Sequence, residues 1–420
     1  MANPSKPPKP PKPPARTLDA LNFFLADVRD GLGPYLAIYL LAVRGPERGW
    51  NEATVGLVLT IAGIVGLLAQ TPAGGLIDRS RNKPRIVMIA ALLVTLSSIS
   101  LPVVSGYAAV TITQSVAAVA GAVFAPAISA ITLGLVGPRL FAKRVGRNEA
   151  FNHAGNAVSA ALAGALAWRF GPVVVFWLMG GLTVASIATA SRIRNADIDN
   201  AVARGLDCEP EEGCDEPSGW RTLVENRPLM IFAAIAFLFH LANAAMLTSV
   251  SQLLSRTVGK DLATSLTAAC IVAAQLVMVP VAIVVGRHTE RWGTKPIFLV
   301  AFGFLAARGA LYTVSNDPWW LVGVQALDGI GAGIFGALFP VVIADLTKGT
   351  GRFNVSQGVV ATLQGLGAAL SATLAGTIIV SAGYAAGFLT LAAIAAVGFV
   401  LYLVAMPETK RHQPTDQGRS

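Results

Sequence analysis

Three ionisable residues, Asp27, Arg29 and Asp30, lie close together in an apolar stretch at residues 21–43. On an α-helix Asp27 and Asp30 share a face, because they are three positions apart, whereas Arg29 points elsewhere. Carboxylates in apolar surroundings can load and release a proton near neutral pH, since desolvation and a neighbouring arginine act on their acidity in opposite directions. The forked guanidinium of Arg29 suits an anionic group. These residues predict a site for protons or cations with an anion-binding side chain beside it.

A second polar pair, His240 and Asn243, has the same three-residue spacing within residues 229–254. Histidine titrates in the physiological range, so we expect His240 to be the titratable counterpart of Asp27 and Asp30. We expect the two pairs to face one central cavity. The alternative is structural: the charges of the first stretch would form an ion-pair network, and His240 would be a hydrogen-bonded core residue.

Other polar side chains occur singly in apolar stretches. Arg308 and Asp328 are expected at similar depth, so a structural ion pair is the first interpretation and contact with a solute is the second. Gln114 and Gln325 occupy related positions and suit neutral hydrogen bonding to a solute. The candidate solute-binding residues are Arg29, Asn243, Gln114, Gln325, Asp328 and Arg308.

The elements that must position these residues are membrane-spanning helices. The chain is 54% hydrophobic and 13% charged, with a mean hydropathy of +0.61, which excludes an ordinary soluble domain. An apolar run of about 20 residues crosses the hydrocarbon core as a helix. Each Asp or Arg at mid-span costs about 2.5–3.5 kcal/mol, so the cluster of Asp27, Arg29 and Asp30 must face protein or a water-filled cavity. The twelve predicted spans are 21–43, 54–77, 86–104, 108–136, 150–167, 173–190, 229–254, 263–285, 297–314, 319–344, 355–380 and 385–406.

The positive charge lies on one side of these spans. Of the 32 Lys and Arg residues, most are in the N-terminal arm, the loops after even-numbered spans, the central polar stretch and the C-terminus. The opposite loops contain only Arg44, Arg48, Arg169, Arg256 and Lys260. This asymmetry follows the positive-inside rule and predicts that both termini and the central stretch are cytoplasmic. The net charge of +9 therefore reflects topology, and a nucleic-acid partner is not expected.

The two halves of the chain carry the same loop motif, 212 residues apart, after the second and eighth spans. An aspartate at a helix end, such as Asp78, can meet the positive N-terminus of another helix and form a latch that breaks when this face opens. The alternative for the basic residues of the loop is that they only fix topology. The residues of this predicted gating loop are Gly74, Asp78, Arg79, Lys83, Gly286, Glu290, Arg291 and Lys295.

With this motif the sequence resembles the major facilitator superfamily along nearly all of its length. The block from Gly74 to Lys83 is similar to the family's signature loop, Gly-x-x-x-Asp-Arg-x-Gly-Arg-Lys, although Arg81 stands where the family usually has glycine. The resemblance implies an all-α membrane protein with twelve transmembrane helices in two pseudo-symmetric six-helix bundles. It also implies that Asp78 and Arg79 are gate residues and that spans 1, 4, 7 and 10 line the solute path.

The expected organisation has five parts. A disordered cytoplasmic arm is expected at residues 1–18, and the two six-helix bundles at 19–190 and 229–406. A cytoplasmic linker at 191–228 joins them, and a cytoplasmic tail follows at 407–420. We expect a monomer whose partners are a small solute, protons and the lipid bilayer.

These features predict a secondary active transporter that moves a small solute across a bacterial inner membrane by alternating access, coupled to protons. An enzyme is not expected, nor is a cofactor or metal, and a metal site at Cys208 and Cys214 is a minor hypothesis. One alternative is efflux of amphipathic compounds. The family's drug–proton antiporters typically have Gly-Pro where this chain has Ser159 and Ala160, which disfavours that alternative. Another is a sensor or scaffold that binds a solute without moving it.

Overall fold

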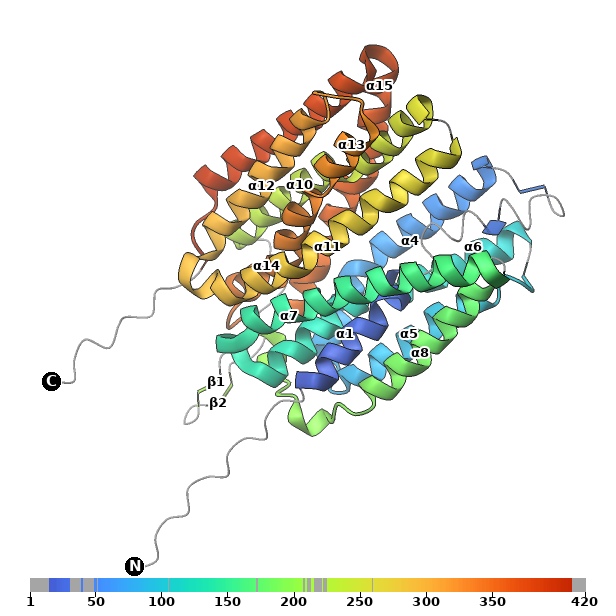
Figure 1. Ribbon diagram of the computed structural model, residues 1–420. Helices are drawn as coiled ribbons and strands as arrows, with labels where there is room; N and C mark the ends of the chain where they lie inside the picture. Colours follow the sequence, from blue (N-terminus) through green and yellow to red (C-terminus); the bar gives the residue numbers. More distant parts are fainter. Residues whose placement is uncertain are drawn as a thin grey trace, which may run out of the picture.

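The computed structural model is almost entirely helical in the part of the chain that it describes (Figure 1). It describes residues 15–30, 39–40, 49–50, 52–104, 106–170, 173–206, 208–209, 213–214, 221, 225–258 and 260–409. The α-helices are α1 (Ala15–Asp30), α4 (Glu52–Arg79), α5 (Lys83–Ile99), α6 (Tyr107–Gly121), α7 (Phe124–Phe170), α8 (Val174–Ala190), α10 (Arg227–Val258), α11 (Lys260–Trp292), α12 (Thr294–Leu311), α13 (Pro318–Gln325), α14 (Asp328–Leu346) and α15 (Phe353–Ala405). Two 3₁₀ turns, η2 (Asn195–Asp197) and η3 (Val202–Arg204), and two short strands, β1 (Cys208–Glu209) and β2 (Gly213–Cys214), lie between α8 and α10.

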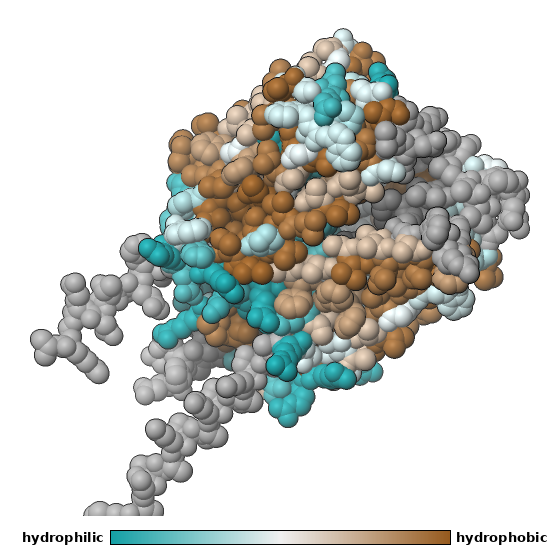
Figure 2. Space-filling view, viewed as in Figure 1, coloured by the Kyte–Doolittle hydropathy of each residue, from teal (hydrophilic) through white to brown (hydrophobic). Residues whose placement is uncertain are grey.

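Seven helical segments of the described chain are long and apolar enough to cross a membrane. Large apolar side chains point outward from the helices; Leu68, Trp177 and Val404 are exposed by 70%, 71% and 78%. Such a surface suits lipid rather than water. Figure 2 shows hydrophobic residues over the sides of the helices and hydrophilic residues gathered toward the end where α1 begins and α15 ends. We call this end the terminal face.

Glycines break two long helices where predicted spans meet. α7 covers the end of the predicted fourth span and the whole of the fifth, and Gly137 interrupts it with a φ of 72°. Gly383 interrupts α15 in the same way between the eleventh and twelfth spans, with a φ of 86°. A side chain is strained at positive φ, so glycine permits these sharp breaks.

Two predicted spans are each divided into two helices, which the apolar sequence did not reveal. The span predicted at 108–136 comprises α6 and the start of α7, and the span predicted at 319–344 comprises α13 and α14. In the second break, tight hydrogen bonds join Leu327 N–H to Val324 O and Gly329 N–H to Ala326 O. These i to i+3 bonds keep the backbone satisfied inside an apolar layer, so no polar loop is needed.

The buried hydrophobic residues form two clusters. One cluster is drawn from residues 18–203, and the other mainly from residues 229–406. α7 contributes to both, because the side chains that follow its glycine break pack into the second cluster. Those residues are Phe141, Ala142, Val145 and Ala150. α7 is therefore the helix that joins the two halves of the molecule.

Asp19, near the start of α1, ties this helix to α7 close to the terminal face. Its carboxylate forms ion pairs with Arg144 and Arg147, both at 2.6 Å. Burial alone would raise its pKa, but the hydrogen bonds and charges of the two arginines outweigh burial and hold the pKa of Asp19 below its ordinary value. The side chains of Asp19 and Arg144 are nearly buried, whereas Arg147 is half exposed.

Replacing Asp19 with asparagine should lower stability at neutral pH by about 3–5 kcal/mol, since it leaves Arg144 buried without its counter-charge. Because the folded-state pKa is depressed, this contribution is present above the unfolded pKa of about 3.9 and is lost as pH falls through the lower folded value. Thermal unfolding in detergent should therefore separate Asp19→Asn from wild type at pH 7, and the two should converge below about pH 4.

The matched control is Asp197→Asn, which breaks an ion pair with Arg194, a side chain exposed by 71%. Such a surface pair contributes less than about 1 kcal/mol. An Asp19→Asn protein as stable as this control at pH 7 would contradict the structural role of the Asp19 ion pairs.

Candidate functional site

A cavity of about 1100 Å³ lies between the two halves of the chain. α1, α4, α5, α6 and α7 line it from the first half, and α14 and α15 from the second. Much of its wall is apolar and includes the rings of Phe335 and Phe339 of α14. The charged and amide side chains of the wall are Arg29, Gln70, Gln114, Glu149, Gln357 and Gln364. A mostly apolar space with a few placed polar groups is typical of sites for small molecules.

Two of the predicted solute-binding residues lie in this wall. Arg29 of α1 is partly buried there. Gln114 of α6 has a buried amide nitrogen with no hydrogen-bond partner among the described residues. An unpaired buried donor costs free energy, so Gln114 is ready to donate a hydrogen bond to a bound molecule.

Of the two carboxylates predicted beside Arg29, the structure describes the side chain of Asp27 and not that of Asp30. Asp27 of α1 is partly buried and is not among the described residues that line the cavity. Asp30 is the last residue of α1, and its side chain lies outside the described part of the structure. Within that part, Arg29 is the residue of the predicted cluster that lines the cavity.

The other predicted polar residues form a buried network in the second half. Arg308 of α12 forms an ion pair with Asp328 at the start of α14 and donates a hydrogen bond to Asn243 of α10. Gln325 donates to Asp328 at 3.2 Å and accepts from Tyr312. The first interpretation, a structural pair, fits this arrangement, because the groups satisfy one another away from the described cavity wall.

His240 of α10 also lies in a packed environment. Its Nδ1 is 3.1 Å from the backbone oxygen of Ala236, one turn earlier. Its ring packs against Phe239 and Phe335, with centroids 5.4 and 4.7 Å away. Neither His240 nor Asn243 is among the described residues of the cavity wall, so the shared cavity expected for them is not seen there.

Sequence reasoning missed the carboxylate that does line the cavity, Glu149 of α7. Its Oε2 lies 4.0 Å from Nε2 of His153, one turn along the helix. Glu149 immediately precedes the predicted fifth span at 150–167, and His153 lies near the start of that span, so neither is among the candidates named from mid-span positions. Continuation of the helical pattern through residues 139–149, past several basic residues, is the signal that could have found them.

Asp78 meets a helix N-terminus on the terminal face. Its Oδ1 accepts hydrogen bonds from the backbone and side-chain nitrogens of Asn354, at 3.2 and 2.8 Å. Its Oδ2 accepts one from the backbone nitrogen of Val355 at 2.9 Å. These residues begin α15, where unpaired N–H groups and the helix dipole favour an anion. The carboxylate therefore joins α4 of the first half to α15 of the second.

The helices touch closely around this contact. A Cβ atom added at Gly74 would lie 2.1 Å from the backbone oxygen of Asn354, and one added at Gly358 would lie 2.3 Å from that of Gln70. On the other side of the face, a Cβ at Gly146 of α7 would lie 2.6 Å from Cα of Gly286 of α11. Two glycine-mediated crossings, α4 with α15 and α7 with α11, thus bring the two halves together.

The second copy of the loop motif makes different contacts. Glu290, the counterpart of Asp78, is exposed, as are Arg79 and Arg291. The N-terminus of α12 is instead capped by Glu408, which accepts hydrogen bonds from the backbone nitrogens of Thr294 and Lys295 at 2.9 and 3.1 Å. The two copies of the loop motif therefore make different contacts despite their similar sequences.

Lys83, in the first copy, is completely buried. Its Nζ donates hydrogen bonds of 2.8 Å to Ser80 O and to Asn200 Oδ1. It thereby holds the segment after α8 against the loop between α4 and α5.

Comparison with known proteins places the chain in a family. The model of the Major Facilitator Superfamily matches residues 19–314 and 243–419. The chain belongs to this superfamily. It is 55% identical over 395 residues to an uncharacterized MFS-type transporter of Mycobacterium tuberculosis, strain CDC 1551, and equally to one of strain H37Rv, covering 94% of this chain and 93% of each relative. The crystal structure of the human organic anion transporter MFSD10 (TETRAN) matches with a TM-score of 0.69 at 16% identity, covering 93% of this chain and 100% of that one.

Membership in the major facilitator superfamily, together with the apolar helices, makes the protein an integral membrane protein that functions in transport of a solute. The human protein shares the fold, and its low sequence identity carries no information on substrate. The cavity between the halves is accordingly the candidate solute site of this superfamily member.

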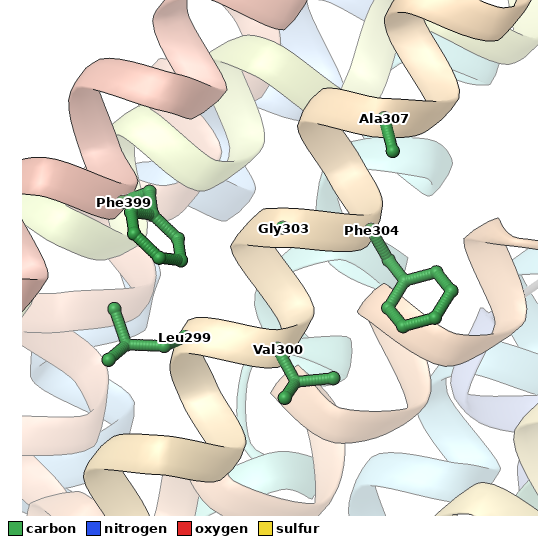
Figure 3. A pocket seen from close by; sticks show the side chains of 6 residues that line it. All are labelled: Leu299, Val300, Gly303, Phe304, Ala307 and Phe399. Atoms are coloured by element: carbon green, nitrogen blue, oxygen red, sulfur yellow. The ribbon is translucent and has the colours of Figure 1, made fainter.

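A second, smaller hollow lies on the outer side of α12 and α15 (Figure 3). It has a volume of about 390 Å³ and an apolar lining that includes Leu299, Phe304 and Phe399. Because no polar side chain lines it, it suits a lipid chain rather than a polar solute.

The metal hypothesis gains no support from the described residues. Cys208 and Cys214 face each other in the β1–β2 pair, and their side chains lie outside the described part. Within that part no group of three His, Cys, Asp or Glu residues could hold a metal ion.

Proposed function

We propose that the protein is a secondary active transporter that moves a small solute across a bacterial inner membrane by alternating access, driven by protons. The observation that carries the proposal is the cavity between the two halves, which contains Arg29 and the unpaired amide of Gln114 and lies beside the interhalf contacts of the terminal face. Breaking those contacts would open the cavity toward that face.

The proposal keeps the arrangement of twelve helices in two bundles, at residues 19–190 and 229–406. α7 and α15 would each supply two spans, and α13 with α14 would supply one. The basic residues of the loops at the terminal face support a cytoplasmic position for that face under the positive-inside rule. The first loop motif is proposed to act in the gate, with Asp78 as its latch. In the second, Gly286 is proposed to take part through its crossing with Gly146, whereas the exposed Glu290 is proposed to fix topology.

Arg29 is the proposed anchor for an anionic group of the solute. It is the positively charged side chain among the described residues of the cavity wall, and a guanidinium can hold a carboxylate, sulfonate or phosphate with two parallel hydrogen bonds. Gln114 would add a hydrogen bond to the same molecule. The human anion transporter, at 16% identity, is too distant to inform the substrate.

Asp27 and Asp30 of α1 are proposed to take part in proton coupling, with His240 as a further titratable group. The α1 carboxylates flank Arg29 in sequence, so a proton gained or lost there changes the field at the anion site. Efflux of amphipathic cations is the second candidate function, and the presence of Glu149 in an otherwise apolar and amide wall favours it.

An Arg29→Ala variant should lose the stabilisation that a small organic anion gives the wild-type protein. A ligand at a hundred times its dissociation constant adds about 2.7 kcal/mol to stability. Thermal unfolding in detergent with panels of organic anions, cations, sugars and peptides measures this effect. Removing the guanidinium should weaken binding at least about tenfold, as loss of charged hydrogen bonds costs about 1.5–3 kcal/mol.

Arg194→Ala is the control, since Arg194 is exposed and is not among the described residues that line the cavity. It should leave the ligand response unchanged. Equal stabilisation of Arg29→Ala and wild type by an anion would remove Arg29 from the site. Stabilisation by apolar cations alone would favour the efflux function.

A further inference from the structure

Glu149 and His153 are titratable groups on one face of α7, one helical turn apart. Their side chains are exposed by only 19% and 12%, and Glu149 lines the cavity. Oε2 of Glu149 and Nε2 of His153 are 4.0 Å apart, close enough for an ion pair when the imidazole is protonated.

The other nitrogen of His153 bridges the two halves of the molecule. Nδ1 lies 2.8 Å from Oε1 of Gln275, which belongs to α11. An amide oxygen can only accept, so Nδ1 donates the hydrogen of this bond. The contact lies beyond the crossing of Gly146 with Gly286 on the same two helices. His153 therefore connects a carboxylate in the cavity wall with the interface between α7 and α11.

A neutral imidazole has one N–H hydrogen, while His153 faces two acceptors, Gln275 Oε1 and Glu149 Oε2. If the hydrogen is on Nδ1, the lone pair of Nε2 faces a carboxylate; if it is on Nε2, Nδ1 can only accept, and the amide of Gln275 must turn over to donate to it. An imidazolium has both hydrogens and serves both acceptors. Uptake of one proton thus strengthens the contact between the halves.

We propose that Glu149 and His153 form a proton-binding site that couples protonation to closure of α7 against α11. The proton comes from water in the cavity, binds Nε2 of His153 beside the carboxylate of Glu149, and returns to water when the helices part. This inference rests on the proposed function, to which it adds a second proton site besides the proposed one at Asp27 and Asp30.

The charged surroundings are compatible with this role. Arg29 of α1 is the other charged group among the described residues of the cavity wall. Asp27 lies on α1 as well, outside the described wall. The remaining elements around the cavity present uncharged groups there, including Gln70 of α4, Gln114 of α6, the backbone of Gly336 of α14, and Gln357 and Gln364 of α15.

The proton itself is the probe for a test. Nitroxide labels at Lys143→Cys of α7 and Arg287→Cys of α11, both exposed on the terminal face, report the separation of the two helices. The labels are placed in a protein whose native cysteines are replaced by serine or alanine. Distance distributions of the reconstituted protein between pH 5 and 8 should show two populations. The short-distance population should grow as pH falls, by up to about tenfold per pH unit for one proton.

Glu149→Gln should remove this pH dependence, because it takes away the counter-charge that holds the second proton. His153→Gln should do the same, and it gives the result if the first variant does not fold. Asp197→Asn, which removes a carboxylate from the surface pair with Arg194, should keep the pH dependence. The proton site would be overturned if the two populations do not shift with pH in wild type. It would also be overturned if they shift as in wild type in both the Glu149 and the His153 variants. Either result would leave transport standing. A single distance at every pH and with every compound that binds would instead contradict alternating access.

Discussion

A Gly146→Leu variant should fold and insert but retain less than about a tenth of wild-type transport, because its side chain prevents α7 from closing on α11. A Cβ atom at this position would lie 2.4 Å from the backbone oxygen of Ala282 and 2.6 Å from Cα of Gly286. Both neighbours are backbone atoms, which cannot turn aside as a flexible side chain can. Overpacking costs about 1–3 kcal/mol, and two backbone neighbours place this contact at the upper end, about 2–3 kcal/mol, so the closed state becomes at least about 30-fold rarer.

The same label pair at Lys143 and Arg287 measures this effect directly. The short-distance population should vanish in Gly146→Leu, while the thermal stability of the protein stays close to that of wild type. Gly181→Leu is the matched control, since Gly181 of α8 is also helical and a Cβ there would meet nothing within 4 Å. A closed population of wild-type size in Gly146→Leu would show that closure does not require this crossing.

Replacing Asp78 with asparagine should weaken the other contact between the halves at the terminal face, that of α4 with α15. The amide keeps one acceptor for Asn354 but turns an N–H group toward the backbone N–H of Val355. Losing a hydrogen bond to a charged group costs about 1.5–3 kcal/mol, which corresponds to a shift of about 10- to 100-fold toward the open state. Accessibility of a cysteine placed at Ser356, which is buried beside this contact, to a water-soluble thiol reagent should rise by a similar factor.

Glu290→Gln provides the comparison within the repeat. Glu290 stands where Asp78 does in the first motif but is exposed on α11. It should change labelling and transport less than about twofold, as surface substitutions usually change stability by under about 0.5 kcal/mol. Equal effects of the two substitutions would mean that the motif acts through topology in both copies, and the latch would have to be abandoned.

The contact of Asp78 with a helix N-terminus could be predicted from the sequence because its signal is local. A carboxylate at a helix end, in a loop otherwise rich in arginine, needs a compensating partner, and the N-terminus of another helix supplies one. Which helix supplies it depends on tertiary packing, so Asn354 and Val355 could not be named. The repeat did not reveal that the two copies differ in their contacts, because Glu290 is exposed whereas Asp78 is buried against α15.

The candidate site was predicted less completely than the fold. Arg29 and Gln114 were found because a polar residue in an apolar run has to face protein or water. The same rule selected His240 and Arg308, but it cannot tell a cavity from a satisfied core network, since both bury polar groups. Glu149 escaped because α7 continues through a basic segment that reads as a loop in a hydropathy pattern.

Counterflow in proteoliposomes tests solute transport by this protein most directly. Vesicles are loaded with an unlabelled compound that stabilises the protein in thermal unfolding, and uptake of the radiolabelled compound is followed without a proton gradient. Wild type should show transient, saturable uptake above that of empty vesicles, and Gly146→Leu should show almost none. A wild-type protein that binds the compound but exchanges it no faster than empty vesicles would contradict transport and indicate a solute sensor.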